Sequence, residues 1–136
     1  MNATINDSIN IQLTVDNGTS SLSLDSTFVL LHNDFLSLKF MDGVIVSTAT
    51  PIGKYNGRLA YPYPKITINN YSFSKKESVV VRNLTPWLFR YKKAVGIIPM
   101  RTLSTKRYLS INLLEEYITP TDSIDERRNH IRYIPV

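Results

Sequence analysis

The residues with the clearest chemical potential lie in a stretch that has no acidic side chain. Between Glu77 and Glu115 the sequence contains no carboxylate, and the basic residues in this interval are Arg82, Arg90, Lys92, Lys93, Arg101, Lys106 and Arg107. Trp87, Phe89, Tyr91 and Tyr108 are interleaved with them. Basic side chains neutralise phosphates, and aromatic faces stack on bases. The window therefore fits an acidic partner, either nucleic acid or an acidic protein surface.

The same spacing also has a structural interpretation. In a strand, Trp87, Phe89 and Tyr91 would lie on one face, and Arg90 and Lys92 on the other. The aromatic side chains would then enter the core, and the cations would form a solvated face. Residues 1–68 carry four Lys/Arg and five Asp, whereas residues 69–136 carry twelve Lys/Arg and six Asp/Glu. This asymmetry places the acidic partner at the second half, and we favour an assembly surface over nucleic acid.

Catalytic and metal chemistry find little support in the sequence. It has no cysteine and only two histidines, His32 at a predicted turn and His130 among arginines. No nucleophile elbow, Walker loop or dinucleotide fingerprint occurs. A hydrolase could use Asp34 and Asp42, but both lie at predicted turns, where Asp is favoured for its own backbone hydrogen bonds. We therefore expect a non-enzymatic protein without cofactor or metal.

The elements that would position these residues are short strands. Residues 8–15 alternate between apolar and polar side chains, which predicts a half-buried strand. Asp residues recur near predicted turns every eight or nine residues from position 7 to position 42, a rhythm typical of a β-sandwich or barrel. Asp42-Gly43 favours a type I′ turn, so residues 35–50 should form a hairpin. Further strands are predicted at 20–31, with a break near residue 25, and at 78–84, 87–93 and 107–113. Residues 65–73 should form either another strand or a small hairpin around Asn69-Asn70.

Two segments depart from this pattern. Residues 51–64 hold three Pro, two Gly and three Tyr, which predicts a long loop that either reaches a partner or packs on its own domain. Its interface candidates are Tyr55, Tyr61 and Tyr63, because tyrosine is a frequent anchor of interfaces. Ser123 and Glu126 have capping-box spacing, so a short helix is expected at 122–130, followed by an extended piece. The interface candidates there are Arg127, Arg128 and Tyr133.

These elements predict an all-β chain of one domain, a β-sandwich or partly open β-barrel with a short C-terminal helix and an extended tail. Residues 1–118 would form the β domain with the 51–64 loop. A second short helix is expected near 113–118. Residues 119–136 would form the C-terminal helix and the extended segment, which docks on a neighbouring subunit or stays loose.

The disulfide-free β domain, the short Asn/Ser/Thr-rich strands, the Tyr/Pro-rich loop at 51–64 and the extended piece at 119–136 together resemble small structural proteins of tailed bacteriophages. Such proteins form the tail, baseplate or neck. The resemblance implies a homo-oligomeric ring in the virion, contacting itself and other virion proteins through loops and termini. The N-terminus has no signal-peptide pattern and no apolar run is long enough to span a membrane, so we expect synthesis in the host cytoplasm. The alternative is a nucleic-acid-binding β-barrel that uses the window 82–108.

Overall fold

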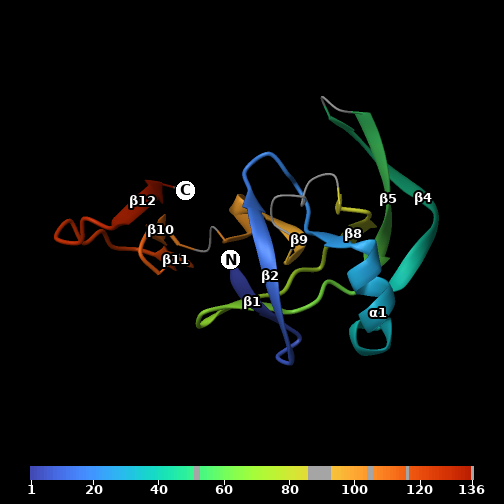
Figure 1. Ribbon diagram of the computed structural model, residues 1–136, viewed down its shortest axis with the longest axis horizontal. Helices are drawn as coiled ribbons and strands as arrows, with labels where there is room; N and C mark the ends of the chain where they lie inside the picture. The colour runs from blue at the N-terminus through green and yellow to red at the C-terminus, as the bar shows by residue number, and fades with distance from the viewer. Residues whose placement is uncertain (51–52, 86–92, 104–105, 116, 136) are drawn as a thin grey trace.

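The computed structural model describes residues 1–50, 53–85, 93–103, 106–115 and 117–135, and most of them lie in β-strands (Figure 1). Within these ranges, nine strands form one mixed sheet and three form a small antiparallel sheet. The large sheet comprises β1 (Asn2–Ile5), β2 (Ile9–Asp16), β3 (Ser23–Asp25), β4 (Lys39–Thr50), β5 (Gly53–Tyr61), β6 (Ile66–Ile68), β7 (Tyr71–Phe73), β8 (Val79–Arg82) and β9 (Ala94–Pro99). The small sheet comprises β10 (Tyr108–Asn112), β11 (Tyr117–Thr121) and β12 (Ile131–Pro135). The helical elements are α1 (Ser26–Leu36) and the short 3₁₀-helix η1 (Met100–Leu103).

The large sheet is open. Its strand order is β4-β5-β8-β3-β9-β2-β1-β6-β7, so β4 and β7 form its outer edges. Neighbours pair antiparallel except β2 with β9 and β3 with β8, which are parallel. Helix α1 follows β3 and packs against β3 and β8. This arrangement confirms the predicted mainly β, sandwich-like class.

One buried cluster connects the two sheets. In β2, Ile11 and Leu13 are buried while Asn10 and Gln12 are exposed, as the alternation predicts. Leu109 of β10 is 1% exposed and belongs to the same cluster as Leu13. Each such side chain contributes about 1.5–3 kcal/mol to stability on burial. The small sheet is therefore packed onto the large one, and the side chain of Asn69 adds a 3.0 Å hydrogen bond to Oγ1 of Thr119.

Helix α1 occupies residues for which the sequence pattern predicted a strand to residue 31 and a turn at 32–34. Both predictions are wrong. Oδ2 of Asp25 accepts hydrogen bonds from the backbone N–H groups of Thr27 and Phe28, at 3.1 and 3.4 Å, and so caps the helix. Ser37, with φ of 52°, ends it in the left-handed conformation. A short apolar run such as Phe28–Leu31 has no periodicity that separates a helix from a buried strand.

The hairpin predicted around Asp42-Gly43 is also wrong. Both residues lie inside β4, where Gly43 has φ of 72°. The pairing of β4 with β5 passes from Phe40/Ala60 directly to Ile45/Arg58, so four residues of β4 lie opposite Leu59 alone. This is a large bulge. Asp-Gly favours a positive φ, which suits a bulge as well as a turn, and pairing with β5 selected the bulge. The predicted loop at 51–64 is also wrong, because residues 53–61 form β5, which pairs with β4.

Several local predictions are confirmed. Of the two alternatives for residues 65–73, the structure has the hairpin around Asn69-Asn70, formed by β6 and β7. β8 lies within 78–84, and β10 lies within 107–113. The strand predicted at 87–93 lies outside the described residues except for Lys93. The structure adds β9, a central strand at 94–99 for which the sequence predicted none.

The C-terminal region forms the small sheet in the order β11-β10-β12. The predicted helices at 113–118 and 122–130 are wrong, because a turn at 113–115 leads into β11 and residues 122–130 form bends and turns. The backbone N–H of Ser123 donates to Oγ1 of Thr121 at 3.2 Å, so Ser123 takes part in a turn instead of a helix cap. β12 pairs with β10 of its own chain. The predicted boundary at residue 118 falls within β11.

Candidate assembly surface

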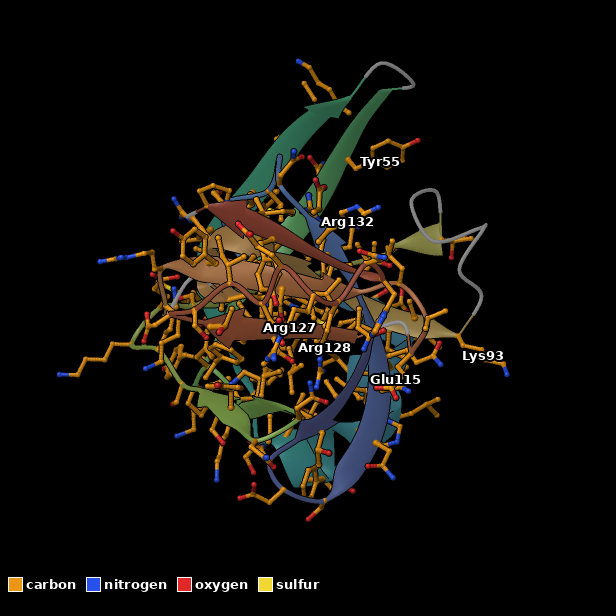
Figure 2. The ribbon with its side chains drawn as sticks, turned by 90° about the vertical axis from the view of Figure 1, so that its left-hand side faces the viewer. Tyr55, Lys93, Glu115, Arg127, Arg128 and Arg132 are labelled. Atoms are coloured by element: carbon orange, nitrogen blue, oxygen red, sulfur yellow. The ribbon has the colours of Figure 1, made fainter. Side chains whose placement is uncertain are left out.

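The outer halves of β4 and β5 form a two-stranded ribbon that leaves the body of the protein. Their pairing runs from Ile45/Arg58 to Thr50/Gly53, whereas β5 meets β8 only through residues 58–60. Figures 1 and 2 show the ribbon extending beyond the rest of the chain, with Tyr55 labelled on it. Isolated two-stranded hairpins are marginally stable in water. We define the ribbon as residues 45–50 and 53–58. Its strand edges are available to a partner.

Two hollows flank Arg58 at the foot of this ribbon. One has a volume of about 420 Å³ and is lined by Leu30 of α1 and Phe40 of β4, among others. The other has a volume of about 410 Å³ and is lined by Ile45 and Val44. Arg58 lines both hollows. Leu30 is 80% exposed and Ile45 68% exposed. We call the two hollows and this apolar rim the Arg58 groove.

Arg58 presents its charge within this groove. Its guanidinium carbon lies 4.3 Å from the centre of the Phe40 ring, a cation–π contact that holds the side chain in place. Within the described ranges, no carboxylate forms an ion pair with it. An anionic group placed in the groove would therefore meet a fixed positive charge. Arg58 was not among the predicted site residues, because its segment was assigned to a loop. The structure shows the alternation of a strand there, with Lys54 and Asn56 exposed and Tyr55 half-buried.

A second exposed apolar surface lies in the turn between β10 and β11. Leu113 is 54% exposed and Leu114 is 74% exposed, and Glu115 follows them. The small sheet lies at one end of the long axis of the molecule, and α1, β4 and β5, whose residues line the Arg58 groove, lie at the other end (Figure 1). Turns usually carry polar or small residues. Folding of the single chain therefore does not account for two leucines at this position.

The predicted tyrosine anchors are in three different environments. The side chain of Tyr55 is half-buried on the ribbon, and Tyr61 is 47% exposed at the end of β5. Tyr63 is only 6% exposed and belongs to the core, so its assignment as an interface residue is wrong. Burial, and secondly the negative charge of Glu77, raise the pKa of Tyr63 to about 12.

The other predicted interface residues gather around Asp125. Nε of Arg127 lies 3.1 Å from Oδ1 of Asp125, and Nε of Arg128 lies 3.7 Å from Oδ2. The backbone N–H of Asp125 donates to the hydroxyl of Tyr133 at 3.0 Å. Hydrogen bonds from Arg127 are the main cause that lowers the pKa of Asp125. Arg127 and Arg128, which Figure 2 shows at the small-sheet end, thus stabilise a turn of their own chain.

The described basic residues of the window 82–108 have different partners and do not share one role. The guanidinium of Arg82 donates to the buried hydroxyl of Ser23 at 2.9 Å, and burial lowers its pKa. Arg101 donates to the carbonyl oxygen of Ser20 at 2.7 Å. Lys106 lies 3.3 Å from Asp122, which also accepts from the backbone of Arg107 at 3.1 Å. These hydrogen bonds lower the pKa of Asp122, that from Arg107 most. Lys93 is exposed, and Arg90 and Lys92 lie outside the described residues.

A third hollow has a volume of about 840 Å³ and lies beside the first residues of β2. Residues 9–11 pair with β1, but pairing with β9 begins only at Gln12. His32 lies at the rim, with Nδ1 3.0 Å from the carbonyl oxygen of Phe28. The polar lining consists mainly of amides and hydroxyls, those of Asn2, Thr4, Asn10, Gln12, Thr67 and Asn69. The hollow can donate and accept hydrogen bonds, and no carboxylate is among the described residues that line it.

No three His, Asp or Glu side chains come together as a possible metal site in the described part of the chain. Of its helices, none combines the length and apolar character needed to cross a membrane. The sequence matches no protein-family model, and no curated protein is significantly similar to it.

Proposed function

We propose that this chain is a non-enzymatic assembly subunit that forms a homo-oligomeric ring in a virus particle, as tail, baseplate or neck proteins of tailed bacteriophages do. The projecting ribbon carries the proposal. The described core does not depend on it, since none of residues 45–50 and 53–58 belongs to the buried cluster. A strand edge that extends from the body is a template for pairing with another chain.

The exposed apolar side chains support the same function. Leu30 on α1 and Ile45 in the ribbon line the Arg58 groove, and Leu113 and Leu114 belong to the turn of the small sheet, which lies at the other end of the molecule. Contiguous apolar surface on a small protein marks a site of association. Two separate surfaces of this kind suit a subunit that contacts two neighbours, as every subunit of a ring does.

Shortening the ribbon tests the proposal. Residues 47–56 are replaced by Asn-Gly, which joins Val46 to Gly57 through a two-residue turn and keeps their pairing. We expect the full chain to form an oligomer of defined mass by light scattering after size exclusion, with little dependence on salt. The shortened chain should remain folded but become monomeric. As a matched control, Asn70→Gly alters the turn between β6 and β7 and should leave the mass unchanged.

Two results would contradict the proposal. One is a full-length chain that stays a monodisperse monomer at high concentration. The other is a shortened chain with the mass of the full-length oligomer. Binding of oligonucleotides that weakens steeply with salt, and that Lys93→Glu reduces, would instead support the nucleic-acid alternative.

A further inference from the structure

We infer that the subunits join head to tail, with the turn at Leu113, Leu114 and Glu115 of one copy seated in the Arg58 groove of the next copy. This inference rests on the proposed self-assembly and names the two surfaces that would meet. The first observation is complementary chemistry. The groove has an apolar rim with Arg58 between its two hollows, and the turn has two exposed leucines followed by a carboxylate.

The turn is held in a defined conformation before it binds. Asn112, only 3% exposed, accepts hydrogen bonds at its Oδ1 from the backbone N–H groups of Leu114 and Glu115, each at 3.0 Å. The N–H of Leu113 donates to the carbonyl oxygen of His130 at 2.8 Å. Because the backbone is already ordered, docking of the two leucines loses little conformational entropy.

The groove is also preformed. Phe40 holds the guanidinium of Arg58, and the bulge of β4 places Val44 and Ile45 beside it. The two hollows, of about 420 and 410 Å³, suit two neighbouring side chains. Glu115 would then face the charge of Arg58, and apolar contact on both sides would exclude water from the pair.

Charge disfavours two of the symmetric arrangements of these surfaces. A two-fold interface that matched groove with groove would place Arg58 against Arg58, and one that matched turn with turn would place Glu115 against Glu115. Like charges facing each other disfavour both arrangements. The elements that carry the groove (α1, β4 and β5) and the small sheet that carries the turn lie at opposite ends of the long axis (Figure 1). When the turn of each copy enters the groove of the next copy, the contact is heterologous, whereas an antiparallel pair that makes the contact twice would stop at a dimer, so the mass of the wild-type oligomer distinguishes the two. A heterologous contact builds a ring when the rotation closes and a filament when it does not.

Mixing two defective variants tests the inference. Arg58→Glu disables the groove and leaves the turn, whereas the double variant Leu113→Ser, Leu114→Ser disables the turn and leaves the groove. We expect each variant alone to be monomeric, with Kd for self-association raised at least about tenfold. An equimolar mixture should form a 1:1 dimer and nothing larger, because one competent pair of surfaces remains. Lys76→Glu and Ile124→Ser, at other exposed positions, are the matched controls and should assemble normally.

The outcomes separate this inference from the proposed function. If both variants keep the wild-type mass while the shortened ribbon abolishes assembly, the contact assigned here is wrong and the assembly function stands. If both are monomeric but their mixture gives no dimer, these two surfaces do not meet. If the wild-type chain never self-associates, both proposals fail. Thermal unfolding of each variant checks that it is folded, and Arg58→Ala replaces Arg58→Glu if the reversed charge prevents folding.

Discussion

Oδ1 of Asp25 accepts a 2.9 Å hydrogen bond from the backbone N–H of Leu84, which lies 59 residues further along the chain. The other oxygen of the same carboxylate caps α1 through Thr27. Leu84 is fully buried, so this bond satisfies a donor that water does not reach. The side chain of Asp25 thus holds the start of α1 next to the end of β8. Both elements contribute residues to the Arg58 groove.

Replacing this side chain should destabilise the fold substantially. We expect Asp25→Ala to lower the free energy of unfolding by about 3 kcal/mol, because it removes a helix cap and leaves the N–H of Leu84 unsatisfied. Asp25→Asn keeps an acceptor oxygen and should cost about 1 kcal/mol. Denaturant unfolding measures both. Asp34→Ala, at an exposed position of α1, is the control, and an equal loss there would contradict this role of Asp25.

Gly96 should tolerate no larger residue, because β9 is tightly enclosed at this point. A methyl group there would lie 2.7 Å from the carbonyl oxygen of Ser23 and 2.9 Å from Cδ2 of Leu13. We expect Gly96→Ala to lower the free energy of unfolding by about 1–3 kcal/mol through overpacking. At exposed Gly18 the nearest atom would be 3.4 Å away, so Gly18→Ala should change stability by less than about 0.5 kcal/mol. Similar values for the two variants would show that the sheet relaxes around position 96.

Tyr63 should make the protein sensitive to alkaline pH. Its pKa is about 12 in the folded chain against 10.0 for a free tyrosine, so the unfolded state ionises first. The stabilisation is therefore complete below pH 10 and is lost as the pH rises towards 12, by about 3 kcal/mol in total. Unfolding by denaturant as a function of pH measures this loss. Tyr63→Phe should remove it from the profile, and an unchanged alkaline slope in that variant would assign the effect to other groups.

Asn112 should influence assembly without belonging to the contact. Asn112→Ala removes the acceptor for the N–H groups of Leu114 and Glu115, which loosens the turn. We expect self-association to weaken about tenfold and the free energy of unfolding to fall by about 1–3 kcal/mol. Light scattering across a concentration series, below the unfolding temperature, measures the first effect. Ser110→Ala, which removes one hydrogen bond from the same strand to the carbonyl oxygen of Thr119, is the control and should leave self-association unchanged.

Local patterns in the sequence determined part of this fold. Alternating apolar and polar residues specify the strand β2, and the polar pair Asn69-Asn70 specifies the turn between β6 and β7. Both patterns are local, because period-two burial and turn geometry depend on adjacent residues. The mainly β class follows from such patterns. Tyr55 was predicted as an interface residue in a loop, and the structure places it in β5 instead; its interface role stays a prediction. The β architecture could therefore be predicted without knowing which residues far apart in the sequence are in contact.

The tertiary structure decided the rest, because those choices depend on residues that are distant in sequence. Residues 26–36 are a helix that packs on β3 and β8, and the carboxylate of Asp25 that caps it also accepts from the backbone of the distant Leu84. Asp42-Gly43 became a bulge since β4 takes its register from β5. The parallel pairing of β2 with β9 joins segments more than eighty residues apart, and no local pattern encodes such a register. The Arg58 groove exists only where these elements meet, so sequence periodicity could identify strands but could not bring Leu30, Ile45 and Arg58 together.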